Sequence, residues 1–187
     1  MKRTALFFGS FNPIHHGHLN VAQAAIDTGK IKEVIFIVSP QSPFKSDADL
    51  LPEQQRLRMV SSVLSSQKQM TCSDVEFQLS RPNYTINTLR NLNVFPGSNT
   101  HTLLMGADVF AQIKSWQNAE EILSHDFMIY PRGGWEIPDE SDKITLLDSP
   151  MMSISATMIR QKVKQHEEIS HLVPEEVAAF LYETHLK

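Results

Sequence analysis

Ten residues near the start of the chain, Gly9 to His18, constrain its fold more than any other stretch. They read Gly-Ser-Phe-Asn-Pro-Ile-His-His-Gly-His and follow a short apolar run at 4–8, while apolar residues recur at helical spacing from His18 to a stop signal at Gly29. This order predicts a strand, a tight turn and a helix. Unpaired N–H groups and the helix dipole favour an anion at the first turn of such a helix. His15 and His18 are three residues apart, so we expect both side chains to face that anion.

The histidine cluster leaves other interpretations open. His15, His16 and His18 could bind a transition metal, because imidazole is a frequent ligand, although no Cys or carboxylate lies nearby at ligand spacing. Each histidine alone could also be an ordinary surface residue. The conjunction of Gly9, Pro13 and the histidines in this order favours phosphate chemistry.

The composition narrows the classes of protein to which this chain can belong. The 187 residues fit one domain, 1–187, and the hydrophobic content of 41% and charged content of 20% are those of a globular protein. A net charge of −4 gives no electrostatic reason to expect nucleic-acid binding. The single cysteine, Cys72, cannot form an internal disulfide, and no stretch approaches the ~18 apolar residues of a membrane helix. We therefore expect a cytoplasmic chain that binds neither nucleic acid nor membrane; a homo-oligomer stays open.

Segments typical of strands and helices alternate along the chain. Strands are predicted at 4–8, 33–39, 70–77, 101–105 and 126–130, and helices at 18–28, 52–65, 85–92, 107–124, 155–168 and 174–185. Such βα repeats predict an α/β fold: a Rossmann-like, doubly wound, mostly parallel sheet with helices on both faces and a C-terminal helical pair. Sheets of this kind bind ligands at the carboxyl ends of their strands, where the turn at Gly9 would lie.

A second candidate phosphate site lies near the end of the chain, in Ile154-Ser155-Ala156-Thr157-Met158-Ile159-Arg160. Ser155 is a good N-cap, Thr157 adds a hydroxyl in the first turn, and the Arg160 guanidinium suits bidentate contact with phosphate oxygens. A plain N-cap followed by a solvated arginine is the simpler alternative.

These two segments resemble the (H/T)xGH and ISSTxIR signatures of the nucleotidyltransferases, and the chain as a whole resembles the bacterial nicotinate-nucleotide adenylyltransferases. The resemblance continues through the proline-rich loop that ends at Lys45, the segment from Arg81 to Leu89, Gly106-Ala107-Asp108 with the later Trp116, and Tyr130-Pro131-Arg132. The chain departs from the family pattern at Ser10, Asn12, Phe44 and Ala156.

The resemblance implies roles for individual residues. It implies ATP binding by Gly9, Ser10, Phe11, His15, Gly17, His18, Gly106, Asp108, Ser155, Thr157 and Arg160, and mononucleotide binding by Lys45, Thr85, Asp108, Trp116 and Arg132. His15, His18 and Arg160 would be the catalytic residues, with Mg²⁺ carried by ATP and no metal site made by the protein. Without the resemblance, Trp116 reads as a core aromatic, Asp108 as a helix cap, and Lys45 and Arg132 as solvated cations.

The implied reaction is transfer of AMP from ATP to nicotinate mononucleotide, which forms deamido-NAD and pyrophosphate. Two alternatives stay open at this point. The acceptor could instead be nicotinamide mononucleotide or phosphopantetheine, or the chain could be a module that senses nucleotides without catalysis.

Overall fold

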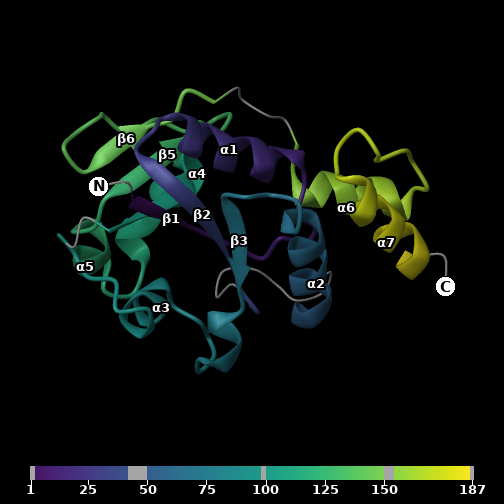
Figure 1. Cartoon of the computed structure of the whole chain (residues 1–187), viewed down its shortest axis with the longest axis horizontal. Helices are drawn as coiled ribbons and strands as arrows, with labels where there is room; N and C mark the ends of the chain where they lie inside the picture. The colour runs from purple at the N-terminus through teal and green to yellow at the C-terminus, as the bar shows by residue number, and fades with distance from the viewer. Residues whose placement is uncertain (1–2, 42–49, 98–99, 150–153, 186–187) are drawn as a thin grey trace.

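Six parallel strands form the centre of the molecule (Figure 1). The structure is a computed structural model that describes residues 3–41, 50–97, 100–149 and 154–185. Its strands are β1 (Arg3–Gly9), β2 (Ile31–Val38), β3 (Met70–Ser73), β4 (His101–Gly106), β5 (Phe127–Tyr130) and β6 (Ile144–Leu146), in the order β3-β2-β1-β4-β5-β6. The chain leaves β1 toward one edge of the sheet and later returns to pair β4 with β1 on the other side. The sheet therefore has its topological switch point between β1 and β4, where open α/β sheets bind ligands.

Helices cover both faces of the sheet. The α-helices are α1 (His16–Asp27), α2 (Glu53–Leu64), α3 (Thr85–Asn91), α4 (Ala107–Phe110), α5 (Ala119–Leu123), α6 (Ala156–Lys164) and α7 (Glu175–His185). Two short 3₁₀ helices, η1 (Val75–Gln78) and η2 (Ile113–Ser115), lie in the connections. Buried residues of α1, α2, α6 and α7 belong to one apolar cluster, and those of α3, α4 and α5 belong to another. The doubly wound, parallel α/β fold that the sequence predicts is confirmed.

The central strand shows why both faces need cover. Ala5 and Phe7 of β1 point into the first cluster, and Leu6 between them points into the second. Successive side chains of a strand alternate between its two faces, so a strand with apolar residues at every position needs helices on both sides. Packing on both faces of the sheet therefore holds the carboxyl end of β1 in place.

The C-terminal pair of helices packs at one end of the molecule, next to α2 and the start of α1 (Figure 1). The Tyr182 hydroxyl accepts a hydrogen bond from the N–H of Ile169 (3.3 Å), which joins α7 to the loop before it. The N–H of His16, at the start of α1, donates to the carbonyl of Leu172 (3.1 Å). The loop before α7 thus contacts the start of α1 directly. No helix in the described ranges is long and apolar enough to span a membrane.

Three details differ from the sequence-based expectations. The strand expected at 70–77 ends at Ser73 and continues as η1, and the single helical region expected at 107–124 is divided into α4, η2 and α5. Asn118 explains part of this division, because its left-handed backbone (φ 55°) cannot lie inside an α-helix. The edge strand β6 was not predicted, because three residues are too few for an alternating pattern.

Candidate active site

Two cavities meet at the carboxyl end of β1. The larger, here called the main cavity, has a volume of about 510 Å³ and lies over the β1–α1 turn and the start of α6. The smaller, here called the second cavity, has a volume of about 220 Å³ and lies toward α3 and Trp116. Phe8, Gly9, Ser10 and Val109 line both. Two separate ligands could therefore approach each other across the wall made by Gly9 and Ser10.

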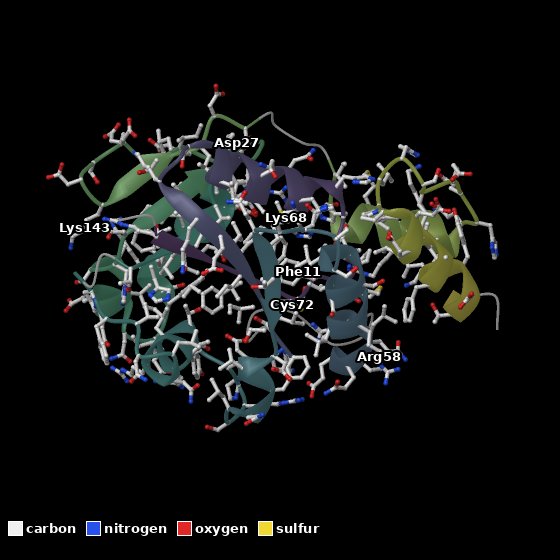
Figure 2. The ribbon with its side chains drawn as sticks, in the orientation of Figure 1. Phe11, Asp27, Arg58, Lys68, Cys72 and Lys143 are labelled. Atoms are coloured by element: carbon white, nitrogen blue, oxygen red, sulfur yellow. The ribbon has the colours of Figure 1, made fainter. Side chains whose placement is uncertain are left out.

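The turn after β1 is held in an unusual conformation by Phe11. Its backbone has a φ of 44°, a region that a bulky side chain rarely adopts. The buried ring lies against Gly9, where an added Cβ would come within 2.9 Å of it. The Phe11 ring packs edge-on against the rings of Phe7 and His18, with ring centroids 5.7 Å and 5.1 Å apart, respectively. These contacts hold the Phe11 side chain in place. Phe11 lies near the centre of the molecule in Figure 2. Its ring supports that of His18, which in turn stacks on His15.

His15 and His18 stack on each other at the start of α1, with ring centroids 3.7 Å apart and an angle of 25° between the planes. His15 occupies the N-cap position in extended backbone, and the Nδ1 of His18 accepts a hydrogen bond from its N–H (3.3 Å). A neutral imidazole that accepts at Nδ1 carries its proton at Nε2. His18 thus has its second nitrogen set as a donor, and its side chain lines the main cavity.

His15 is the more buried of the two, with 5% of its surface exposed. Burial is the main cause that lowers the pKa of His15 to about 4, and the nearby Arg132 and His16 side chains act in the same direction. His15 is therefore neutral near pH 7 and can donate one hydrogen bond without carrying charge. Its Nδ1 is buried without a partner in the described part of the chain. A Cβ on Gly17 would come within 3.0 Å of the His15 ring, which explains the small residue between the histidines.

Asp108 and Arg132 also line the main cavity. Asp108 follows β4 and Arg132 follows β5, and the Nε of Arg132 lies 3.6 Å from the Oδ2 of Asp108. The Oδ1 of Asp108 is buried and has no hydrogen-bond partner among the described residues. A Cβ on Gly106 would lie only 2.3 Å from this oxygen, so the close approach of the carboxylate requires glycine there. An unpartnered carboxylate oxygen at a cavity wall suits a ligand hydroxyl.

The start of α6 completes the main cavity. The Oγ of Ser155 caps the helix by accepting from the N–H of Met158 (3.2 Å), and Thr157 and Arg160 also line the cavity. Arg160 donates from Nη1 to the carbonyl of Asn12 (2.8 Å) and from Nη2 to the hydroxyl of Thr157 (3.4 Å). Its Nε is buried and unpartnered within the described residues. Arg160 thus links α6 to the β1–α1 turn and retains an unused donor.

The second cavity contains the aromatic and hydroxyl groups that the sequence indicated, Trp116 and Thr85, together with two residues that it did not. Glu76 is 2% exposed and accepts a hydrogen bond at Oε1 from the hydroxyl of Thr88 (2.7 Å). Burial raises the pKa of Glu76 above its usual value. The Nδ2 of Asn83 donates to the Glu76 carbonyl (2.9 Å). Both residues follow β3; Asn83 lies in the segment from Arg81 to Leu89 but was given no role there, and no motif marks Glu76.

Arg56 on α2 is another site-related residue that the sequence did not indicate. Helical spacing predicts Leu57, Val60 and Leu64 on the inner face, yet Leu57 is only half-buried and Arg56 is fully buried. Its guanidinium donates to four backbone carbonyls around the end of β1 and β2. A charged residue beside an apolar stripe normally predicts a solvated side chain. No pattern in the sequence distinguishes Arg56 from its exposed neighbour Arg58.

The structure thus brings together most of the residues that the sequence selected. The main cavity is lined by Gly9, Ser10, Phe11, His15, Gly17, His18, Asp108, Arg132, Ser155, Thr157 and Arg160. Gly106 lies directly behind Asp108, and Thr85 and Trp116 line the second cavity. The family resemblance implies that Arg132 binds the mononucleotide together with Thr85 and Trp116, but Arg132 lines the main cavity instead. Lys45, like Phe44, lies outside the described residues.

Comparison with known proteins identifies the family. Residues 6–162 match the cytidylyltransferase-like family. The chain is 39% identical over 183 residues to a probable nicotinate-nucleotide adenylyltransferase of Cytophaga hutchinsonii, covering 94% of this chain and 93% of the relative. It is 33% identical to one of Clostridium novyi, covering 100% and 99%.

A solved structure has the same fold. It is the nicotinic acid mononucleotide adenylyltransferase of Plasmodium falciparum, complexed with NaAD, which aligns with a TM-score of 0.81 at 21% identity and covers 100% of this chain and 97% of its own. At that identity the likeness shows the fold alone. On the sequence matches, the chain belongs to the cytidylyltransferase-like family and, within it, to the nicotinate-nucleotide adenylyltransferases.

Proposed function

We propose that the protein transfers AMP from ATP to nicotinate mononucleotide, forming deamido-NAD and pyrophosphate. The observation that carries this proposal is the pair of cavities that share the wall at Gly9 and Ser10. A reaction that joins two nucleotides needs a donor and an acceptor site with the reacting phosphates at their junction. The Plasmodium falciparum relative, in complex with NaAD, holds the joined product of such a reaction.

The main cavity suits the triphosphate of ATP. It combines the side chains of His18 and Arg160 with the first-turn amides of α1 and α6, all of which are donors. We assign the unpartnered carboxylate oxygen of Asp108 to a ribose hydroxyl of the nucleotide. Arg132, paired with that carboxylate, adds positive charge where phosphates would lie.

The chemistry requires positioning and charge stabilisation more than proton transfer. A phosphate oxygen of the mononucleotide is already anionic and attacks the α-phosphorus of ATP in line, while pyrophosphate leaves. Two anions must be brought together, and negative charge develops on the leaving group. Preorganised donors and cations lower that barrier, as in other phosphoryl transfers. We propose His15, His18 and Arg160 for this task; neutral His15 acts as a hydrogen-bond donor rather than as a cation.

Mg²⁺ is proposed to arrive as part of the substrate MgATP. In the described ranges no three His, Cys, Asp or Glu side chains gather where they could hold a metal ion. ATP phosphates and water are the ligands that Mg²⁺ commonly keeps. The two histidines of the β1–α1 turn stack on each other and line the main cavity, which also contains groups suited to phosphate. We therefore assign them to ATP binding and not to a metal ion.

The second cavity is proposed to hold the pyridine ring of the acceptor, with Trp116 against the ring. The first-turn N–H groups of α3, beginning at Thr85, favour a carboxylate over a neutral amide. We therefore expect the nicotinate mononucleotide to be the preferred acceptor. The single cysteine, Cys72, keeps a reducing compartment, the cytoplasm, as the proposed location.

Pyrophosphate release on mixing the protein with MgATP and nicotinate mononucleotide tests the proposal. Rapid release with ATP and none with CTP is the expected result. Binding of ATP without turnover with any phosphate acceptor would instead identify a nucleotide sensor.

A parallel assay with nicotinamide mononucleotide tests the choice of acceptor. We expect kcat/KM at fixed MgATP to be higher for the nicotinate form. Equal use of the two acceptors would contradict the assignment of the Thr85 amides to the substrate carboxylate.

A further inference from the structure

Among the residues that the structure describes, the largest fully buried side chain belongs to a cation, Arg56, which lines neither cavity. Its Nε donates to the carbonyl of Leu51 (2.8 Å), and its Nη2 donates to that of Pro40 (2.7 Å). Its Nη1 donates to two carbonyls at once, those of Ser10 (2.6 Å) and Ser39 (2.7 Å). One nitrogen thus joins the residues that follow two neighbouring strands, β1 and β2. The N–H of Ser39 also donates to the carbonyl of Gly9 (2.9 Å).

The positive charge of Arg56 has no carboxylate partner in the described part of the chain. Glu53, one turn earlier on α2, pairs with Arg81 instead. Burial lowers the pKa of Arg56 to about 10, so the guanidinium is still charged near pH 7. Burying a charge with only carbonyl dipoles as partners is costly compared with an apolar residue of similar size.

The hydrogen bond to Ser10 fixes the direction of one backbone donor. The C=O and N–H of a trans peptide unit point in opposite directions. Because the Ser10 carbonyl points toward Arg56, the N–H of Phe11 points away from it, to the side of the turn that lines the main cavity. Among the described residues this N–H has no protein acceptor. Phe11 lines the main cavity and directly follows Ser10, which lines both cavities.

We propose that Arg56 is a positioning residue of the transfer reaction. It holds the Ser10–Phe11 peptide so that the N–H of Phe11 is preset as a donor to phosphate at the junction of the cavities, and its buried charge raises the electrostatic potential there. This role rests on the proposed adenylyl transfer, because a preset donor matters most where charge develops in the transition state.

Substitutions at Arg56 test the proposal, with Arg58 as the matched control. Arg58 lies two residues further on α2 and points outward at the rim of the molecule (Figure 2). In R56K the charge remains, but three donors on one nitrogen cannot reach four separate carbonyls. We expect kcat to fall about tenfold in R56K and about 10²–10³-fold in R56M, as for loss of a preset donor. R58K and R58M should keep the wild-type kcat.

The split between binding and turnover separates positioning from folding. Calorimetric titration with ATP alone, without acceptor, reports the folded binding-competent fraction of each variant. We expect R56K to bind ATP with a stoichiometry equal to that of the wild type and a Kd within about threefold, because the missing stabilisation belongs to the transition state. A kcat of R56K equal to that of R58K would overturn the proposal. An R56K whose low kcat is matched by an equal loss of binding-competent protein would reduce Arg56 to a structural brace.

A second measurement needs no variant. Inorganic pyrophosphate titrated into the wild-type protein should shift the backbone amide resonance of Phe11 in NMR spectra more than that of exposed Asn20, which lies outside both cavities. An unmoved Phe11 amide at saturating pyrophosphate would overturn the proposal even if no Arg56 variant folds. A wild-type protein that releases no pyrophosphate from its substrates would refute the proposed function instead. The two failures are therefore distinguishable.

Discussion

The two histidines of the β1–α1 turn differ in what surrounds them and therefore in what they can do. His15 is buried beside Arg132 and is neutral near pH 7, whereas His18 accepts from the backbone at Nδ1 and has Nε2 as its donor. Their stacked rings form one unit. The pattern in the sequence predicted that both would face one site, but it could not distinguish their environments.

Replacing His18 by Ala should mainly lower turnover. Loss of one preset donor typically costs about 2.7–4 kcal/mol, or roughly 10²–10³ in kcat. The measurement is kcat at saturating substrates, with H16A as the control because His16 does not line the main cavity. A folded H18A protein with wild-type turnover would exclude His18 from the catalytic machinery.

The buried His15 should make stability depend on pH. Its pKa is about 4 in the folded protein against 6.5 for an unperturbed histidine in the unfolded chain, so between these values the unfolded chain binds a proton that the folded state does not. Stability therefore rises with pH through this window and is lost on acidification, by at most about 3 kcal/mol. Burial also lowers the pKa of His101 and of His125, which adds to the effect with the same sign.

Comparison with the H15Q variant isolates the part of this pH dependence of stability that is due to His15. Urea unfolding at about pH 7 and about pH 5 should show a smaller loss of stability on acidification for H15Q than for the wild-type protein. Identical losses for the two proteins would show that His15 does not titrate as its burial indicates.

At the level of elements, the site is assembled from the ends of β1 and β4 and the starts of α1 and α6. Glycine and capping signals predicted these ends well, because both depend on nearby residues. A side chain at Gly9 would meet the Phe11 ring, and Ser155 accepts a hydrogen bond from the first turn of α6. Arg56 and Glu76 could not be predicted in the same way. Each is polar and buried only because distant backbone or hydroxyl groups satisfy it, and such long-range partners leave no periodic signal.

Arg160 connects two of these elements, so its removal should affect both binding and geometry. R160A loses the hydrogen bond to the Asn12 carbonyl and the charge at the main cavity. We expect kcat/KM for ATP to fall by about 10²-fold or more in R160A and by less in R160K, since an ammonium keeps the charge but lacks the planar fork. Unchanged ATP use in both variants would contradict the assignment; the exposed Lys164 on the same helix, changed to Ala, is the control.

For the whole molecule, the parallel sheet and its two helical layers were predictable, because apolar runs such as 34–38 in β2 require cover on both faces. The course of the chain between these elements was less predictable from the sequence. The connection from β5 to β6, and the packing of α7 against α2, depend on contacts between residues far apart in sequence. Those contacts determine how firmly the C-terminal helices are attached.

Leu181 of α7 tests that attachment. It is 1% exposed in the cluster that includes α2, and it lines neither cavity. L181A should lower the free energy of unfolding by about 2–5 kcal/mol, with kcat of the folded protein unchanged. Urea unfolding and an assay at low temperature check both points, and E183A, an exposed change on the same helix, should stay within about 0.5 kcal/mol. A stability of L181A equal to that of E183A would show that α7 is not anchored through this cluster.

The hydrogen bonds from Arg160 to Asn12, and from His16 to Leu172, have a consequence for how the protein is made. A ribosome delivers the chain from its N-terminus, so both histidines emerge well before Arg160 and Leu172, which close the turn around them. The two partners of the first bond are 148 residues apart. A nascent chain can pair β1 with β2 and begin to collapse, but its phosphate cradle is incomplete until α6 and the loop before α7 have left the exit tunnel. We therefore expect a chain that stops before α6 to lack the Arg160 contact and to be unable to consume ATP.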